Sequence, residues 1–239
     1  MKAMILAAGF GSRLKPWTDY HPKTLAIVNG KTLLQRNIEY LQTFNITDII
    51  INVHHFAHQI IEAIQQNNGW GSNITISDET NVVLETGGGL KKASWFFKED
   101  FVLLNTDILT DMNLHNMILQ HKENKPLATL AVSDRNTSRY LFFNTKNELY
   151  GWKNIQTGEE KPQPFTAEIN DLTRKAFSGI HVINPAIFPL MHQEGKFSMI
   201  DVYINLCREH SIHYFDHSSS KFIDVGKPEN ILNAESLFN

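Results

Sequence analysis

Three continuous apolar segments constrain the fold of this chain more than any other feature of its sequence. They are KAMILAA, DIIINVHH and DFVLLNTD, at residues 2–8, 48–55 and 100–107. Apolar residues that follow one another without alternation are typical of strands covered on both faces. Between these segments lie two stretches with the apolar spacing of helices, at residues 32–44 and 57–67. This order predicts an α/β fold whose first half is built on a parallel sheet.

The second half of the chain has shorter apolar segments, separated by polar turns. LATLAVS, RYLFFN and ELYGW are predicted to form antiparallel strands. Further strands are expected from FSGIHVI, IHYFDH and KFIDVG, and a helix from PENILNAESLF, with Pro228 near its first turn. Residues 154–175 are polar and aperiodic, so we predict a long loop or a mobile lid there.

The composition narrows the class of partner. The formal net charge of the 239 residues is -3, without a basic stripe that could follow a nucleic-acid backbone. No segment approaches the roughly 20 apolar residues of a membrane span, and the N-terminus lacks the basic region of a signal peptide. We therefore expect a cytoplasmic protein with a small-molecule partner. The single cysteine, Cys207, excludes an internal disulfide and a multi-cysteine zinc site, and its apolar surroundings favour a packing role.

The first apolar segment runs directly into LAAGFGSRLKPWTDYHPKTL, residues 6–25. Gly9 and Gly11 let backbone N–H groups approach an anion closely, and Arg13 and Lys23 add two positive charges. We interpret this arrangement as a cradle for a triphosphate. The alternative for the glycines alone is a tight strand-to-helix turn flanked by solvated cations.

Two better-known phosphate motifs fit this chain poorly. The dinucleotide-binding fingerprint requires a third glycine where Leu14 stands, and no suitable acidic strand end follows about twenty residues later. The triplet GKT at residues 30–32 imitates the end of a P-loop, but the first glycine of that motif would fall at Leu25. We therefore disfavour a nicotinamide cofactor and predict that GKT begins a helix.

Residues 6–25 resemble the signature of sugar-1-phosphate nucleotidyltransferases, LAAGxGxRxxPxTxxxPKxL, and match it at each fixed position. Further family motifs follow in the family's order: ETGGG at residues 85–89, the strand ending in Asn105, Thr106 and Asp107, FSGI at residues 177–180, and DVGKPE at residues 224–229. The resemblance implies a Rossmann-like nucleotidyltransferase fold, with a mixed, mostly parallel central sheet flanked by helices. It also implies one domain over residues 1–239, with a nucleotide-binding half at 1–110 and a sugar-phosphate-binding half at 111–239.

The reaction that this resemblance implies joins two anions. A sugar 1-phosphate oxygen attacks the α-phosphorus of a nucleoside triphosphate, and pyrophosphate leaves. Such chemistry requires fixed cations and a hard metal ion. Asp107 and Asp224 each end an apolar segment, where α/β sheets place ligands, and two carboxylates with phosphate oxygens and waters suit Mg²⁺. The family pattern makes these aspartates the predicted metal ligands, with Arg13 and Lys23 as the predicted catalytic cations.

The resemblance also implies residues that contact the substrates. The predicted nucleotide-binding residues surround the glycine loop and ETGGG; they are Ala8, Gly9, Gly11, Ser12, Arg13, Lys23, Glu79, Thr86 and Gly87. Glu79 and the backbone at Glu85 to Gly87, a glycine-rich turn in ETGGG, are expected to contact the base, with helix capping as the alternative for Thr86. Asn105, Ser178 and Gly179 are the predicted sugar contacts, and Asn105 has the alternative of a buried amide that pins neighbouring strands.

Histidines and lysines outside these motifs are weaker candidates. His54 and His58 have the spacing of two metal ligands on one helical turn, but no HExxH pattern accompanies them. A turn or solvent-facing role is therefore favoured for these histidines and for His55. Lys153 and Lys161 are alternative candidates for the second lysine that related enzymes bring to the sugar phosphate, and a solvated loop is the other interpretation of both.

The substrates are predicted from finer resemblances. Within the family, ETGGG and the chain length are most similar to uridylyltransferases acting on N-acetylmuramate 1-phosphate, which predicts UTP and a place in cell-wall sugar recycling. Two alternatives are a guanylyltransferase acting on mannose or heptose 1-phosphate, and a nucleotide-sensing subunit without turnover. Thr106 and Phe222 stand where the family usually has glycine and tryptophan, so we expect a different sugar pocket.

Overall fold

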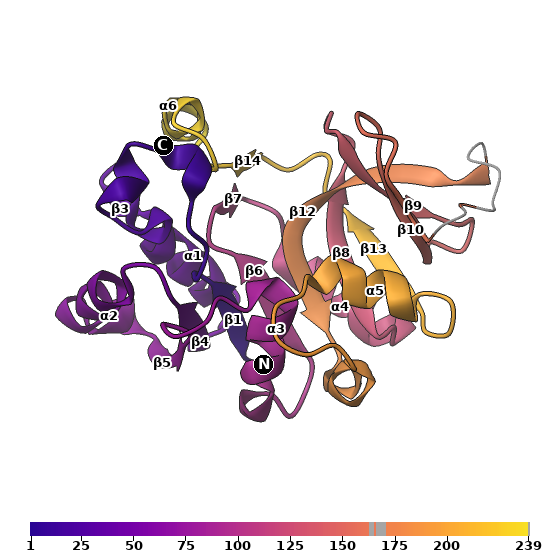
Figure 1. The fold of residues 1–239 in the computed structure, drawn as a ribbon, viewed down its shortest axis with the longest axis horizontal. Coiled ribbons are helices and arrows are strands. Elements are labelled where there is room, and N and C mark those ends of the chain that lie inside the picture. The colour runs from indigo at the N-terminus through magenta and orange to yellow at the C-terminus, as the bar shows by residue number, and fades with distance from the viewer. Residues whose placement is uncertain (163–164, 166–170, 239) are drawn as a thin grey trace.

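The computed structural model describes residues 1–162, 165 and 171–238 (Figure 1). Ten strands form its main sheet: β1 (Ala3–Leu6), β4 (Asp48–Val53), β5 (Asn73–Asp78), β6 (Phe101–Asn105), β8 (Ala128–Ser133), β9 (Arg139–Phe143), β10 (Leu149–Asn154), β11 (Glu160–Lys161), β12 (Thr173–Ile183) and β13 (Ile212–Asp216). Their order is β11-β10-β9-β12-β6-β1-β4-β5, with β8 beside β12 and β13 beside β8. Two short ribbons lie outside this sheet, β2 (Ile27–Val28) with β3 (Lys31–Thr32) and β7 (Ile108–Thr110) with β14 (Phe222–Asp224).

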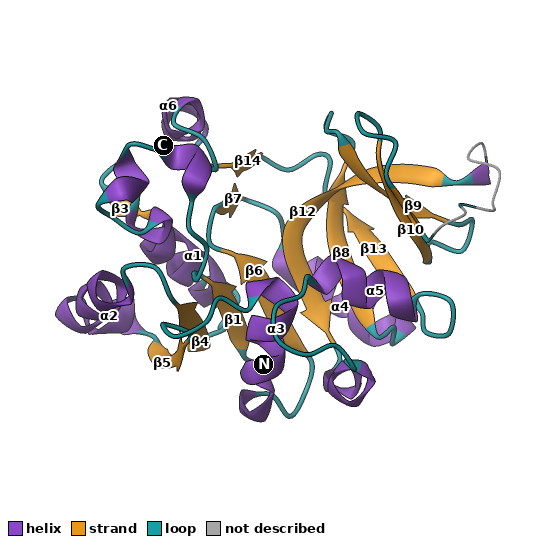
Figure 2. Ribbon diagram, in the orientation of Figure 1, coloured by secondary structure: helices purple, strands orange, loops and turns teal. Residues whose placement is uncertain are grey.

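Most strands of the main sheet run in one direction. β5, β4, β1 and β6 pair in parallel, and β13 is parallel to β8. β12 is antiparallel to β6, β8 and β9, and β10 is antiparallel to β9 and β11. Thus β12 and β10 run against the other described strands of this sheet. The predicted α/β fold with a mixed, mostly parallel central sheet flanked by helices is confirmed (Figure 2).

Helices cover both faces of the sheet. The α-helices of the described residues are α1 (Leu33–Gln42), α2 (Ala57–Gln66), α3 (Glu85–Lys92), α4 (Leu114–Asn124), α5 (Met199–Leu206) and α6 (Glu229–Leu237). One hydrophobic cluster joins the sheet to α1, α2 and α4, and a second joins it to α3 and α5. Within β1, Ala3 and Ile5 belong to the first cluster, whereas Met4 and Leu6 belong to the second. Both faces of β1 are therefore buried, which explains its continuously apolar sequence.

The long strand β12 departs from the sequence-based expectation. It bends at Gly179, whose φ of +73° favours glycine, and it pairs with β9 before the bend and with β6 after it. β8 lies along its other edge, with a shift of register between Phe177 and His181. The predicted strands from residue 127 to 152 are present, and β9 and β10 form an antiparallel hairpin. β8, however, pairs with β12 and β13 rather than with β9.

Several local predictions can be compared directly with the structure. GKT does begin a helix, because the Thr32 side chain accepts a hydrogen bond from the backbone N–H of Gln35 at the start of α1. Cys207 packs against the second cluster as predicted, and burial raises the pKa of its thiol. Residues 154–175, predicted as a long loop, include β11 and the start of β12, but residues 163–164 and 166–170 lie outside the described part. Within the described chain, no helix has the length and apolarity to cross a bilayer.

Candidate active site

A cavity of about 430 Å³ opens at the carboxyl ends of β1, β4 and β6. This edge is where parallel α/β sheets place their ligands. Nine of the predicted substrate and metal residues line the cavity: Ala8, Gly9, Gly11, Ser12, Arg13, Lys23, Thr86, Asn105 and Asp107. The other five do not line it: Glu79, Gly87, Ser178, Gly179 and Asp224. The glycine loop, the end of β6 and the start of α3 thus share one cavity.

The glycine loop is shaped by a close approach between its two ends. Gly11 has a φ of +62°, and a Cβ atom there would lie 2.7 Å from the Cβ of Lys23 and 2.9 Å from the Cγ2 of Thr18. The Thr18 hydroxyl also donates a hydrogen bond of 3.0 Å to the carbonyl of Gly11. Only glycine fits both this backbone conformation and this contact. The loop therefore brings Lys23 next to the residues that follow β1.

This packing predicts different outcomes for the two loop glycines. Gly11→Ala should lower the free energy of unfolding by at least about 1–2 kcal/mol, the approximate cost of a left-handed backbone for an L-residue, because the clash of the new Cβ with Lys23 and Thr18 adds to that cost. Gly9→Ala is the matched control, because a Cβ at Gly9 would meet no heavy atom within 4 Å. It should change stability by no more than about 0.5 kcal/mol. Urea unfolding of both variants checks the prediction, and equal stabilities would contradict it.

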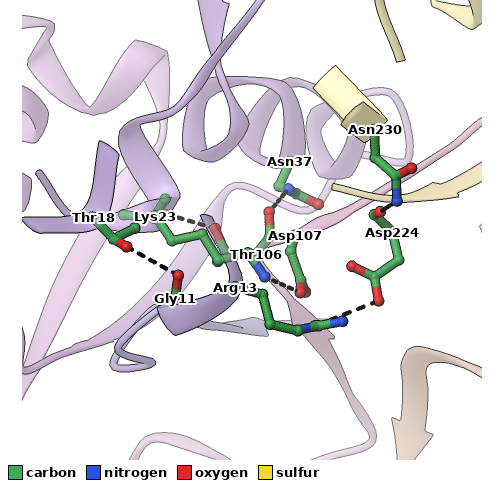
Figure 3. Close-up of polar contacts among 10 residues, drawn as sticks. Gly11, Arg13, Thr18, Lys23, Asn37, Thr106, Asp107, Asp224 and Asn230 are labelled. Carbon is green, nitrogen blue, oxygen red and sulfur yellow. Dashed lines mark hydrogen bonds and ion pairs between the residues drawn. The ribbon is translucent and has the colours of Figure 1, made fainter. Parts of the chain in front are cut away.

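Two cations and two carboxylates form ion pairs at this end of the sheet (Figure 3). The Lys23 ammonium contacts the Asp107 carboxylate, and Nη2 of Arg13 lies 3.8 Å from Oδ2 of Asp224. Burial raises the pKa of Asp224, and the nearby charge of Asp107 raises it further, against the opposing effect of Lys23 and Arg13. The two carboxylates therefore lie close enough to repel each other.

The backbone beside each carboxylate is anchored by hydrogen bonds (Figure 3). The Asn37 side-chain amide in α1 donates to the Thr106 carbonyl at 2.9 Å, and the Asn230 side-chain amide in α6 donates to the Asp224 carbonyl at 2.6 Å. The backbone N–H of Val225 donates to the Asp107 carbonyl at 2.8 Å, next to the β7–β14 ribbon. The Val225 hydrogen bond thus joins the segments that carry the two aspartates, although these residues lie far apart in the sequence.

The oxygen atoms of this pair fit a hard divalent cation. Oδ1 of Asp224 is buried and has no hydrogen-bond partner, which leaves a carboxylate oxygen free for a ligand. Among the described residues, no group of three or more His, Cys, Asp and Glu side chains could hold a metal. The protein would thus supply two carboxylates, and waters or phosphate oxygens would supply the rest. Mg²⁺ is commonly bound in this way.

The ETGGG motif forms the start of helix α3 and not the expected turn. The backbone N–H groups of Gly87 and Gly88 donate to the Phe197 carbonyl, at 2.9 and 3.3 Å. Thr86 lines the cavity, and its hydroxyl accepts a hydrogen bond from the backbone N–H of Met199, at the start of α5. Its capping role therefore serves α5 and not its own helix. Of this motif, Glu85 and Thr86 face the cavity.

Glu79 lies behind the cavity wall. Its side chain is 2% exposed and accepts hydrogen bonds from the Asn52 amide at 2.8 Å and from the backbone N–H of Leu84. Burial raises the pKa of Glu79, and these two donors oppose the rise. Asn52 does line the cavity, and it accepts a hydrogen bond from the backbone N–H of Ala7. Glu79 therefore holds Asn52, which in turn holds the start of the glycine loop.

The predicted sugar contacts lie around the bend of β12. Asn105 lines the cavity, and its side-chain amide lies 2.8 Å from the Cβ position of Gly179. Ser178 is buried, with its hydroxyl unpartnered. Thr106 and Phe222, the two residues that depart from the family pattern, each contact another side chain. The Thr106 hydroxyl lies 2.5 Å from that of Thr24, and the Phe222 ring packs 5.5 Å from the ring of His217.

The remaining histidine and lysine candidates lie outside the cavity lining. Nδ1 of His54 is 2.7 Å from the Glu79 carbonyl, and Nε2 of His55 is 3.3 Å from the Thr18 carbonyl. His58 is exposed, on α2. Lys153 pairs with Glu160 at 2.9 Å, and Lys161 pairs with Asp201 at 2.8 Å.

Sequence reasoning missed several residues that line the cavity, namely Phe10, Asn52, Val83, Lys196, Ser198 and Gly226. Asn52 had a detectable signal, because a polar residue near the end of an apolar strand is unusual. Gly226 had another, as part of DVGKPE: a Cβ there would lie 2.6 Å from both Nη2 of Arg13 and Oδ1 of Asp224. Lys196 had none, since it meets Glu85, at 3.4 Å, only in the folded chain.

Comparison with known proteins identifies the family of this chain. The sequence model of the family described as "Nucleotidyl transferase" matches residues 2–238. The chain belongs to this family. Two relatives are each 29% identical: the mannose-1-phosphate guanyltransferase of Yarrowia lipolytica, aligned over 243 residues, and the UTP–glucose-1-phosphate uridylyltransferase of Synechocystis sp., aligned over 245 residues. The alignments cover 100% and 95% of this chain, but 64% and 60% of the relatives. This nucleotidyl transferase chain thus spans less than two thirds of their length.

A solved structure supports the same fold. The crystal structure of HddC from Yersinia pseudotuberculosis complexed with GMP-PN matches this chain with a TM-score of 0.79 and 22% sequence identity. The match covers 100% of this chain and 99% of HddC. The nucleotidyl transferase fold therefore accounts for the whole chain, from the glycine loop to α6.

Proposed function

We propose that this chain transfers a nucleotidyl group from a nucleoside triphosphate to a sugar 1-phosphate. An oxygen of the sugar phosphate forms a bond to the α-phosphorus, the bond from that phosphorus to the bridging β-oxygen breaks, and pyrophosphate leaves with that electron pair. The observation that carries the proposal is the cluster of Arg13, Lys23, Asp107 and Asp224 beside the glycine loop. The first three of these residues line the cavity, and Asp224, which lies outside that lining, pairs with Arg13. Two relatives of the chain support the proposal, because they are named as a mannose-1-phosphate guanyltransferase and a UTP–glucose-1-phosphate uridylyltransferase.

Each charged group has a distinct proposed role. The planar fork of Arg13 suits two oxygens of the β- and γ-phosphates, whereas the compact charge of Lys23 suits the α-phosphate or the sugar phosphate. Asp107 and Asp224 would hold Mg²⁺, which when bound supplies positive charge to the phosphate oxygens. Once both substrates are bound, these groups would be in place before the chemical step and would stabilise charge in the transition state without further reorganisation.

The remaining cavity residues are proposed to bind the base and the sugar. Ala8, Gly9 and Ser12 offer backbone groups near the phosphates, and Thr86 lies on the wall where a base could bind. Asn105 is the proposed sugar contact within the cavity. Ser178 and Gly179 would act from behind it, by shaping the β12 bend against Asn105.

Two pairs of nucleoside triphosphate and sugar 1-phosphate are candidate substrates. UTP with N-acetylmuramate 1-phosphate is the prediction from the ETGGG motif. GTP with mannose 1-phosphate is supported equally, because the relatives include several mannose-1-phosphate guanyltransferases as well as a uridylyltransferase. We therefore retain both pairs as candidates and do not favour uridylyl transfer over guanylyl transfer.

A substrate panel tests these alternatives. UTP, GTP, CTP and dTTP should each be combined with N-acetylmuramate, glucose, mannose and heptose 1-phosphates, and pyrophosphate release measured. We expect one triphosphate to dominate by about 10⁴ in kcat/KM if the cavity hydrogen-bonds one base edge. A higher kcat/KM for GTP with mannose 1-phosphate would exclude the uridylyl pair. A folded protein that binds triphosphate and releases no pyrophosphate with any pair would favour the nucleotide-sensing alternative.

A further inference from the structure

The four charged groups of the site neutralise one another in pairs. Lys23, proposed to bind phosphate, contacts Asp107, and Arg13, with the same proposed role, faces Asp224 (Figure 3). Each group proposed to hold the triphosphate thus already has a partner among the groups proposed to hold the divalent cation. A triphosphate alone or a cation alone meets charges that are already compensated.

The two pairs differ in strength. The side chains of Lys23 and Asp107 are 11% and 15% exposed, so their interaction is little screened by solvent. The Arg13–Asp224 pair is longer, at 3.8 Å, and its side chains are 57% and 38% exposed. Exposed ion pairs contribute little. Lys23 should therefore compete for its carboxylate more effectively than Arg13 does.

The carboxylates are also fixed more firmly than the cations. Hydrogen bonds from Asn37, Val225 and Asn230 anchor the backbone beside Asp107 and Asp224. Lys23 and Arg13 are long side chains on three-residue 3₁₀ helices. Partner exchange can consequently occur by rotation of the two cations, while the carboxylates keep their places.

We propose that substrate binding exchanges the partners of these ion pairs. Lys23 and Arg13 turn from the carboxylates to the triphosphate, and Asp107 and Asp224 are thereby freed for the divalent cation. The inference rests on the proposed function, and it adds that binding of the triphosphate and binding of the divalent cation are coupled. Triphosphate and cation each strengthen the binding of the other, and this coupling is reciprocal.

The exchange predicts that removing a catalytic cation tightens metal binding. Lys23→Met should raise the affinity of the nucleotide-free protein for Mn²⁺ by about tenfold, within the roughly 5- to 150-fold range of coupled sites. The reason is that Asp107 would remain beside Asp224 without its compensating charge. Arg13→Met should give a smaller increase. Lys15→Met, which removes an exposed cation paired with Asp19 at 2.9 Å, should give none.

A second experiment removes the carboxylate of the Lys23–Asp107 pair and measures triphosphate binding. Asp107→Asn should tighten binding of UTP and GTP in the presence of EDTA by a similar factor, because Lys23 is then free to meet phosphate. Asp111→Asn is the matched control: its side-chain oxygen accepts from the backbone N–H of Lys221 at 2.8 Å, a bond that an amide oxygen preserves. Fluorescence or calorimetric titration gives both affinities.

Neither measurement requires turnover, so the exchange and the proposed reaction can fail separately. Unchanged or weaker Mn²⁺ binding by Lys23→Met, or unchanged or weaker triphosphate binding by Asp107→Asn, would overturn the exchange. Thermal melting confirms that each variant is folded, and Lys23→Gln replaces Lys23→Met if the latter does not fold. If both affinities rise while the wild-type protein shows no pyrophosphate release, the exchange stands and the reaction assignment is wrong.

Discussion

Asp107→Asn is expected to reduce nucleotidyl transfer to background while the protein remains folded. The substitution keeps the size of the side chain but removes one of the two negative charges proposed to hold Mg²⁺, and a neutral amide is a weaker ligand for a hard cation. It also leaves Lys23, which is largely buried, without its counter-charge. Pyrophosphate release with the best substrate pair measures turnover, and circular dichroism measures folding.

A control variant accompanies this experiment, and two results would refute the metal assignment. Asp111→Asn should keep turnover near the wild-type level, because Asp111 is exposed and lies at the end of β7, outside the cavity lining. Addition of EDTA should abolish wild-type turnover. Full activity of Asp107→Asn, or wild-type activity that EDTA does not change, would refute the metal assignment.

The parallel half of the fold could be predicted because its sequence pattern has one physical cause. β1, β4 and β6 are buried on both faces, and a strand buried on both faces is apolar over most of its length. α1 was also predictable, since Thr32 combines a capping side chain with the helical spacing that follows it. In these elements, local sequence and tertiary burial impose the same requirement.

The pairing of β12 could not be predicted in this way. Its apolar segment indicates a strand but carries no information about which strands lie beside it. The bend at Gly179 lets one strand pair with β9 and then with β6 along the same edge. That arrangement depends on the close approach of Gly179 to Asn105, a contact between distant parts of the chain.

The charged cluster could be predicted from the sequence more easily than the part of the cavity wall that is proposed to bind the base. Arg13, Lys23, Asp107 and Asp224 occur in motifs that end strands, and the topology brings strand ends together. The ETGGG glycines instead serve packing, since a Cβ at Gly87 would lie 2.9 Å from the carbonyl oxygen of Phe197. Nothing near Gly87 in the sequence indicates that neighbour. Glycine-rich sequence therefore predicted close approach correctly but could not identify what approaches.

Lys23→Ala is expected to slow turnover by about 10²–10³, or ~2.7–4 kcal/mol, the range for loss of one preorganised charge stabiliser. The position of Lys23 explains why no neighbour among the described residues is expected to substitute for it. Gly11 brings Lys23 against the glycine loop, and the other cations that line the cavity in this part of the chain, Arg13 and Lys196, pair with Asp224 and Glu85. If the ion pairs exchange as proposed, this loss of turnover will accompany tighter binding of Mn²⁺. A general weakening of the site would instead reduce both.

The matched control for this prediction is Lys15→Ala. Lys15 belongs to the same loop, but it is solvent-exposed and pairs with Asp19, so its removal should change turnover by less than about threefold. Single-turnover measurements at saturating triphosphate separate the chemical step from substrate binding. If Lys23→Ala also kept turnover within about threefold, Lys23 would be a cation that pairs with Asp107 and takes no part in the reaction, and the phosphate cradle would have to rest on Arg13 and the loop amides.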